Sequence, residues 1–187
     1  MFARVYAAAA LVALGTTAAA QDAPFGSDTD QDYAADLWAA MEEDGLIGPD
    51  APVIFPYAGT EPHGFQLSTL YTTATVDGHE GVLVIKNNYG PSGVSADEVV
   101  TDPQGHLAAV TVMFKRAEGY DDETGNWFYA KYLKDGALDR NPAGMALAGL
   151  VGKNADAGCI ACHQNAGGGD YLFTTDADLS ETLTMAD

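Results

Sequence analysis

Residues 107–116 read Leu-Ala-Ala-Val-Thr-Val-Met-Phe-Lys-Arg, and this stretch decides the fold class. β-branched and aromatic residues are frequent in it, which is typical of a strand. Three further stretches have the same character, and they cover residues 67–76, 81–88 and 126–133. The links Asp77-Gly78-His79 and 121–125 resemble hairpin connections. The pattern predicts an α+β fold, mainly an antiparallel sheet with a few helices.

Two helices are expected beside this sheet. The first covers residues 32–44, and Gly45 can end it in a left-handed conformation. Its apolar residues recur every fourth position, at Tyr33, Leu37 and Met41. The second covers residues 143–151 and leads toward a cysteine pair. No internal repeat is visible, so residues 32–187 are predicted to form a single domain.

The charge of the chain excludes several kinds of partner. Its 187 residues include 27 acidic and 8 basic side chains, which gives a formal net charge of −19. A nucleic-acid-binding protein needs a clustered basic face, because contacts with phosphates supply most of its affinity. Eight basic residues spread over the chain cannot build such a face. We therefore expect no nucleic-acid partner, and attraction to an anionic membrane surface is also disfavoured.

The first twenty residues resemble a secretory signal peptide. Met1 to Arg4 form a short positive segment, Val5 to Leu14 are apolar, and small residues end at Ala20. A membrane anchor is the alternative, but the apolar run is short for a span of about 20 residues. We expect cleavage after Ala20, a flexible segment at 21–31 and an exported, periplasmic protein without a membrane span.

The strongest functional signal is the segment Cys159-Ile160-Ala161-Cys162-His163, which has the spacing of a c-type haem attachment motif. Residues three and four apart share one face of a helical turn. Both cysteines can therefore reach the vinyl groups of one haem, while His163 binds the iron as the proximal ligand. A disulfide, a thioredoxin-like pair and a zinc site are the alternatives. The adjacent histidine and the absence of any other cysteine favour haem c.

Several segments, in order and spacing, resemble the cytochrome P-460 family. They are 61–64 (Glu-Pro-His-Gly), 83–86 (Leu-Val-Ile-Lys), 110–116, 119–132 and 170–174, together with the haem motif. The resemblance implies a β-rich domain, usually a homodimer, with one covalent haem c that is five-coordinate and open on its distal side. For members whose porphyrin is cross-linked to a lysine, the resemblance implies oxidation of hydroxylamine to nitrous oxide or nitric oxide. The related cytochromes c′-beta lack that lysine and bind nitric oxide.

Lys86 separates these possibilities, because it stands where the resemblance places the cross-linking lysine. Val82, Val84 and Lys86 share one face of the expected strand. A lysine on such a face must reach solvent, pair with a charge or react. The resemblance favours the cross-link, and with it an enzyme that passes electrons to a redox partner such as another cytochrome. A gas-binding protein is the alternative, and a six-coordinate electron-transfer cytochrome is a third possibility.

The other candidate residues are expected to have ordinary roles. We expect His63 to pack within its proline-rich loop rather than to line the haem, and Met113 to belong to the core. Tyr171 and Phe173 are expected to cover the haem. The acidic run Asp121-Asp122-Glu123 is expected to be solvated.

Overall fold

The computed structural model describes residues 24–173. Its elements in chain order are α1 (Asp28–Glu43), β1 (Tyr57–Ala58), β2 (Gln66–Val76), β3 (His79–Tyr89), α2 (Ala96–Thr101), α3 (Pro103–His106), β4 (Leu107–Lys115), the 3₁₀ turn η1 (Asp122–Thr124), β5 (Trp127–Leu133), β6 (Ala148–Gly149) and α4 (Cys159–His163). The predicted signal peptide lies outside the described residues. None of the helices within 24–173 is both long and apolar enough to span a membrane.

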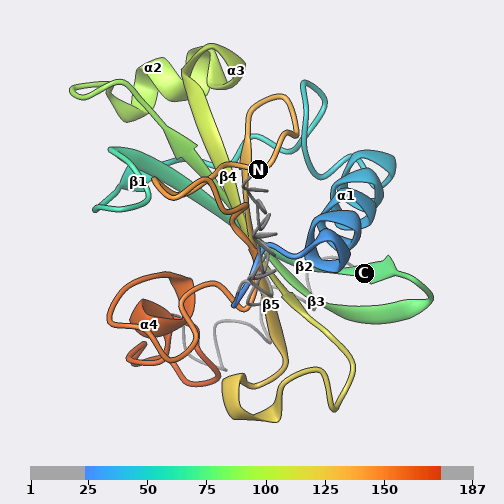
Figure 1. Ribbon diagram of the computed structural model, residues 1–187. Helices are drawn as coiled ribbons and strands as arrows, with labels where there is room; N and C mark the ends of the chain where they lie inside the picture. The colour runs from blue at the N-terminus through green and yellow to red at the C-terminus, as the bar shows by residue number, and fades with distance from the viewer. Residues whose placement is uncertain (1–23, 174–187) are drawn as a thin grey trace, which may run out of the picture.

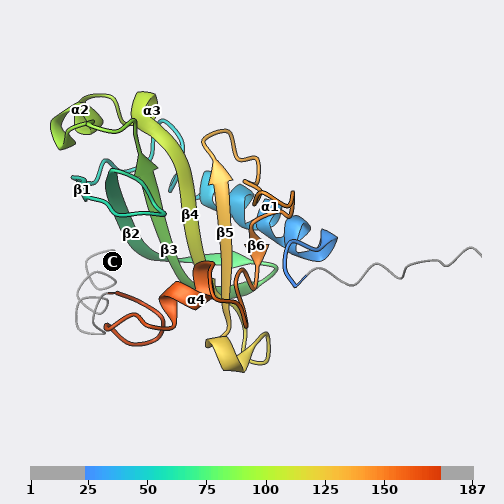
Figure 2. The same cartoon turned by 60° about the vertical axis from the view of Figure 1, so that its left-hand side comes forward.

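A single antiparallel sheet of six strands, in the order β1-β2-β3-β4-β5-β6, organises the domain. Each strand pairs with the next along the chain, so the sheet is a meander (Figure 2). Asp77 and Gly78 connect β2 and β3 with φ angles of 52° and 75°. Positive φ at both central residues is the hallmark of a type I′ hairpin turn, whose twist matches that of the strands. The predicted α+β class and the four long strands are confirmed.

Helix α1 begins at Asp28, four residues before the expected start. Ser27 caps it, because its side chain accepts a hydrogen bond from the Asp30 N–H while the Asp30 carboxylate binds the Ser27 N–H. This capping box extends the helix into the segment that the sequence marked as flexible. At the other end, Gly45 and Leu46 donate to Glu42 and Met41 carbonyls. These two bonds form a Schellman motif, and they confirm that Gly45 terminates the helix.

The prediction of a helix at residues 143–151 is wrong. Gly144 and Gly149 have φ angles of 83° and 90°, which no α-helix contains. The chain instead runs beside β5, where Ala148 and Gly149 pair with Ala130 and Tyr129 as strand β6. The edge of β5 supplies backbone partners for this segment, and that long-range pairing outweighs its local helical composition.

The two faces of the sheet carry different partners. Alternate residues such as Leu83, Val112 and Phe128 pack against α1, on what we call the helix face. The intervening residues Val84, Met113, Trp127 and Tyr129 lie on the other side, which we call the site face. Ile160 of α4 and Leu172 pack on the site face. Figure 1 shows α1 and α4 on opposite sides of the sheet. The sheet therefore separates a structural core from the cysteine-histidine segment.

Candidate functional site

Residues Cys159–His163 form the single helical turn α4, as the motif predicts. Ile160 is buried in the site-face cluster, and its N–H donates to the Val151 carbonyl at 2.9 Å. Gly158 precedes the turn with a φ of 125°, and a Cβ there would lie 2.7 Å from Gly152 Cα. Only glycine suits both that φ angle and that close approach. This glycine contact and the buried Ile160 hold the turn against the sheet.

Both cysteines are free thiols, so the structure contains no disulfide between them. Cys159 is half-buried and Cys162 is exposed. Burial raises the pKa of the Cys159 thiol to about 11, so the thiol is protonated at neutral pH. Two thiols on one helical turn suit the formation of two thioether bonds to one group.

His163 is buried, and its ring orientation is fixed. Its Nδ1 lies 2.9 Å from the carbonyl oxygen of Tyr171. A carbonyl can only accept, so Nδ1 carries the proton and the lone pair is on Nε2. The rings of Tyr129 and Phe173 approach the imidazole edge-on, with centroid distances of 5.7 and 5.2 Å. Burial lowers the pKa of His163, which keeps the imidazole neutral and able to bind a metal.

Tyr171 follows an unusual backbone turn. Asp170 and Tyr171 both have left-handed φ angles, 43° and 64°. Such conformations are costly for residues other than glycine and persist where neighbouring contacts hold them. The Asp170 carboxylate binds Lys115 Nζ at 2.7 and 2.8 Å, and the Asp170 carbonyl accepts from Trp127 Nε1 at 3.0 Å. These contacts hold the Tyr171 carbonyl in place beside Nδ1 of His163.

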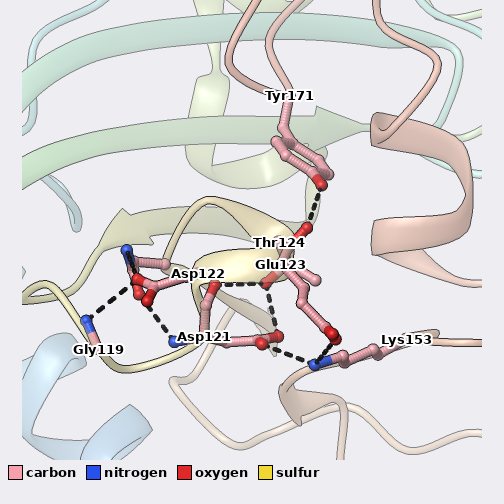
Figure 3. A network of polar contacts seen from close by, with 8 residues as sticks. Gly119, Asp121, Asp122, Glu123, Thr124, Lys153 and Tyr171 are labelled. Atoms are coloured by element: carbon pink, nitrogen blue, oxygen red, sulfur yellow. Dashed lines mark hydrogen bonds and ion pairs between the residues drawn. The ribbon is translucent and has the colours of Figure 1, made fainter.

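A polar network anchors the same turn to η1 (Figure 3). The Tyr171 hydroxyl donates to the Glu123 carbonyl at 2.8 Å. Lys153 Nζ pairs with Asp121 at 2.6 Å and with Glu123 at 2.9 Å. Asp121 is therefore an ion-pair partner and not the solvated residue expected from the sequence. Tyr171 packs beside the site-face cluster, and its carbonyl and hydroxyl make the specific contacts with His163 and Glu123.

Lys86 lies on the site face, in register with Thr69 of β2 and Thr111 of β4. Burial lowers the pKa of this ammonium group, while the nearby Cys162 raises it. The positive charge of Lys86 in turn contributes to the lowered pKa of His163. The lysine that the sequence singled out therefore lies on the face of the sheet against which the cysteine-histidine turn packs, more than seventy residues away along the chain.

His63 also belongs to this site, which the sequence did not predict. Its ring centroid lies 6.3 Å from that of His163, with the two planes at 89°. Its Nδ1 lies 3.3 Å from Thr111 Oγ1. Burial, together with the charge of Lys86, lowers the pKa of His63 to about 4. The structure therefore contradicts the expectation that His63 merely packs within its loop.

The site face also holds buried polar atoms that lack partners. Tyr129 Oη and Asn88 Oδ1 are two such atoms among the described residues. Buried polar groups are normally hydrogen-bonded, so such atoms indicate an additional partner at this face. A haem c site needs two thiols for thioether bonds, an imidazole nitrogen that is free to bind iron, and apolar side chains around them. This face provides all three. The described residues include no cluster of three or more His, Cys, Asp or Glu suited to another metal ion.

The sequence matches the cytochrome P460 family over residues 69–174, which is more than half of the chain. The chain belongs to the cytochrome P460 family. A member of this family is a haem c protein, so one covalently bound haem c is its cofactor. No curated protein and no solved structure gave a match.

The cytochrome P460 match begins at residue 69, and His63 precedes it. One signal could have pointed to that histidine, because it stands in the Glu-Pro-His-Gly segment that resembles the family. Neither the spacing nor the composition indicates which ring it would approach. Met113, by contrast, is buried on the site face with Val84 and Tyr129, as expected for a core residue.

Proposed function

We propose that this protein oxidises hydroxylamine to nitric oxide or nitrous oxide at its haem c and passes the electrons to an external acceptor. The observation that supports this most is that Lys86 shares the site face with Val84, on the side of the sheet where Ile160 of α4 packs, and that burial and the charge of Lys86 both lower the pKa of His163. A lysine at this position is what separates the hydroxylamine-oxidising members from the gas-binding relatives. The proposal therefore depends on whether Lys86 is bonded to the haem.

In this proposal, Cys159 and Cys162 hold the haem through thioether bonds, and His163 binds its iron through Nε2. The bound haem supplies the redox chemistry that removes electrons from the substrate nitrogen. The Tyr171 carbonyl fixes the His163 tautomer at a distance of 2.9 Å and increases the electron-donating character of the ring. The buried side chains of Val84, Met113 and Tyr129 exclude water from this face.

Lys86 would act through its amine. Burial lowers its pKa and thereby favours the neutral form, which has the lone pair that a nucleophile needs. A bond between Lys86 Nζ and a porphyrin carbon replaces one N–H and one C–H bond. Its formation therefore requires a two-electron oxidant of the peroxide class, with both hydrogens leaving in water. The cross-link would distort the macrocycle, which is one of the ways in which a protein adjusts a haem.

The cellular setting follows from the same proposal. Residues 1–20 resemble a signal peptide, and c-type haem attachment suits an exported protein, so we place the protein in the periplasm. With a net charge of −19, an acidic surface suits a basic redox partner such as a small cytochrome. A homodimer is the expected assembly, and light scattering of the purified haem protein tests it.

Mass spectrometry of the digested haem protein tests the proposal directly. The peptide with Lys86 should stay attached to the haem peptide of Cys159 and Cys162, and Lys86→Arg should release it. Lys134→Arg, a change of an exposed lysine on the β5–β6 connection, is the matched control and should leave the attachment intact. Hydroxylamine turnover should disappear in Lys86→Arg and persist in the control. Recovery of an unmodified Lys86 peptide from wild-type protein, with tight nitric oxide binding and no turnover, would favour a gas-binding protein instead.

A further inference from the structure

We propose that Trp127 is a redox-active residue, which gives one electron to the haem site when a peroxide oxidises that site, while the indole N–H proton passes to the Asp170 carboxylate. This inference rests on the proposed attachment of haem at the cysteine-histidine turn. It does not depend on hydroxylamine chemistry. The oxidant belongs to the class that the proposed Lys86 cross-link also requires. Such a residue protects the site when it meets peroxide in the absence of a substrate.

Trp127 lies in the apolar cluster that packs against the cysteine-histidine turn. It is 1% exposed on the site face, and Ile160 of α4 belongs to the same cluster. Tyr129 follows two residues along β5 on the same face, about 7 Å away, because a strand rises about 3.3 Å per residue. The Tyr129 ring in turn lies 5.7 Å from the His163 ring. Aromatic rings at these spacings form a short route for an electron between Trp127 and His163.

The indole nitrogen of Trp127 has a proton acceptor beside it. Its N–H donates to the Asp170 carbonyl at 3.0 Å, and the nitrogen also lies 3.3 Å from Oδ1 of the Asp170 carboxylate. An indole that loses an electron becomes a strong acid, so its proton moves to a neighbouring base. The Asp170 side chain is 46% exposed, so water can accept the proton from it in turn. Trp127 can therefore lose an electron and a proton together.

Lys115 makes the loss of that proton necessary. Its Nζ lies 4.8 Å from the centroid of the Trp127 ring, and it binds both oxygens of the Asp170 carboxylate at 2.7 and 2.8 Å. This ammonium group is attracted to a neutral indole ring but repels a ring that carries a positive charge. The radical cation of Trp127 is therefore disfavoured. The neutral radical that remains after proton transfer is the state that this environment stabilises.

Tyr129 is closer to His163, but it is a poorer place for the oxidising equivalent. An oxidised phenol must release its hydroxyl proton. Tyr129 is 2% exposed, and its Oη atom is buried without a hydrogen-bond partner within residues 24–173. Its proton therefore has no protein acceptor, whereas the proton of Trp127 has one. The other tryptophan, Trp38, belongs to α1 and packs on Tyr132 at 4.8 Å on the helix face.

Oxidation of Trp127 accompanies the reduction of hydrogen peroxide to water. The peroxide accepts two electrons and two protons and leaves as two molecules of water. One electron comes from the haem and the other from the Trp127 indole. The indole N–H bond breaks, and its proton goes to the Asp170 carboxylate. A one-electron donor, such as a reduced redox partner, later returns the electron to the indole, and the nitrogen takes up a proton again.

Electron paramagnetic resonance of the ferric haem protein, frozen directly after an equimolar addition of hydrogen peroxide, tests the proposal. The wild type should show an organic radical whose signal narrows with ring-deuterated tryptophan and not with ring-deuterated tyrosine. Trp127→Phe should lose this signal. Trp38→Phe removes the other tryptophan of the chain and is the matched control, which should keep the signal. Asp170→Asn removes the base and should lower the radical yield.

Electron-nuclear double resonance of the same frozen samples tests the proton transfer. A neutral radical should show no coupling to an exchangeable proton on the indole nitrogen. If Trp127→Phe does not accumulate with haem, labelled tryptophan in Trp38→Phe identifies the radical, because Trp127 is then the one tryptophan left in the chain.

Several results would overturn the inference. They are the absence of an organic radical, narrowing with labelled tyrosine instead, loss of the signal in Trp38→Phe, an undiminished yield in Asp170→Asn, and a persistent coupling to the N–H proton. A protein that forms the Trp127 radical without oxidising hydroxylamine would refute the proposed function alone. Hydroxylamine turnover by a protein that forms no such radical would refute this inference alone.

Discussion

The carbonyl oxygen of Tyr171 lies 2.9 Å from Nδ1 of His163, and this contact links the turn at residues 170–171 to the imidazole. The carbonyl makes the imidazole a stronger electron donor, and it also fixes which nitrogen remains for a metal. The position of the carbonyl depends on two left-handed residues in sequence, Asp170 and Tyr171. Contacts from β4, β5 and η1 stabilise this turn, so distant residues can adjust the His163 ring through it.

The Asp170 carboxylate should influence the reduction potential of the haem. Asp170→Ala removes the ion pair with Lys115 and loosens the turn, which weakens the bond between the Tyr171 carbonyl and His163. A less electron-rich imidazole stabilises the ferrous state, so the potential should rise. A bond weakened by about 1 kcal/mol in one oxidation state corresponds to about 40 mV.

Potentiometric titration of the haem protein measures this shift. Lys115→Met should move the potential in the same direction, because it removes the other half of the ion pair. Asp135→Ala changes a carboxylate in the loop after β5, and it should have no effect. Equal potentials in Asp170→Ala and wild type would show that the turn does not depend on this carboxylate.

The hydroxyl of Tyr132 should stabilise the attachment of α1 to the sheet. It donates a buried hydrogen bond of 2.7 Å to the Ala34 carbonyl. Tyr132→Phe should therefore lower the free energy of unfolding by about 1 kcal/mol. Tyr57→Phe, which removes an exposed hydroxyl bonded to Thr69, is the control and should have a smaller effect. Urea unfolding followed by circular dichroism compares the two variants, and equal losses would contradict the expectation.

The apolar contacts of α1 should contribute more than its hydrogen bonds. Leu37 is fully buried between α1 and the helix face. Leu37→Ala should reduce the free energy of unfolding by about 2–5 kcal/mol, because it removes apolar contacts and leaves a cavity. Leu133→Ala, at a residue that is 41% exposed, should cost less than about 1 kcal/mol. If Leu37→Ala lowers the free energy of unfolding only slightly in the same urea experiment, the helix can repack around the shortened side chain.

The Glu98 carboxylate should make the start of α2 sensitive to acid. Its hydrogen bonds with the backbone and side chain of Ser95 lower its pKa below the ordinary value of 4.5. A lowered folded pKa stabilises the folded state above pH 4.5, and this contribution is lost as the pH falls through the folded value. Carboxyl carbon chemical shifts in an NMR titration report this pKa. It should move back toward 4.5 in Ser95→Ala and stay low in Ser95→Thr.

Local signals in the sequence predicted the elements that depend on neighbouring residues. Gly45 ends α1 as expected, since a Schellman motif involves residues only a few positions apart. Asp77 and Gly78 form the predicted hairpin, because a two-residue turn needs positive φ at both positions. The cysteine-histidine spacing predicted a helical turn for the same local reason, and α4 has that form.

Contacts between distant residues decided the rest. Residues 143–151 have a helical composition, but the open edge of β5 recruits them as β6, because unpaired backbone groups of a strand need partners. Alternation along β3 placed Lys86 on one face of its strand, yet only tertiary packing brought the cysteine-histidine turn to that same face. The sequence by itself determined the sheet and the cysteine-histidine turn. The tertiary structure alone decided that His63 faces His163, because no local pattern specifies which loop a sheet will bring to a given ring.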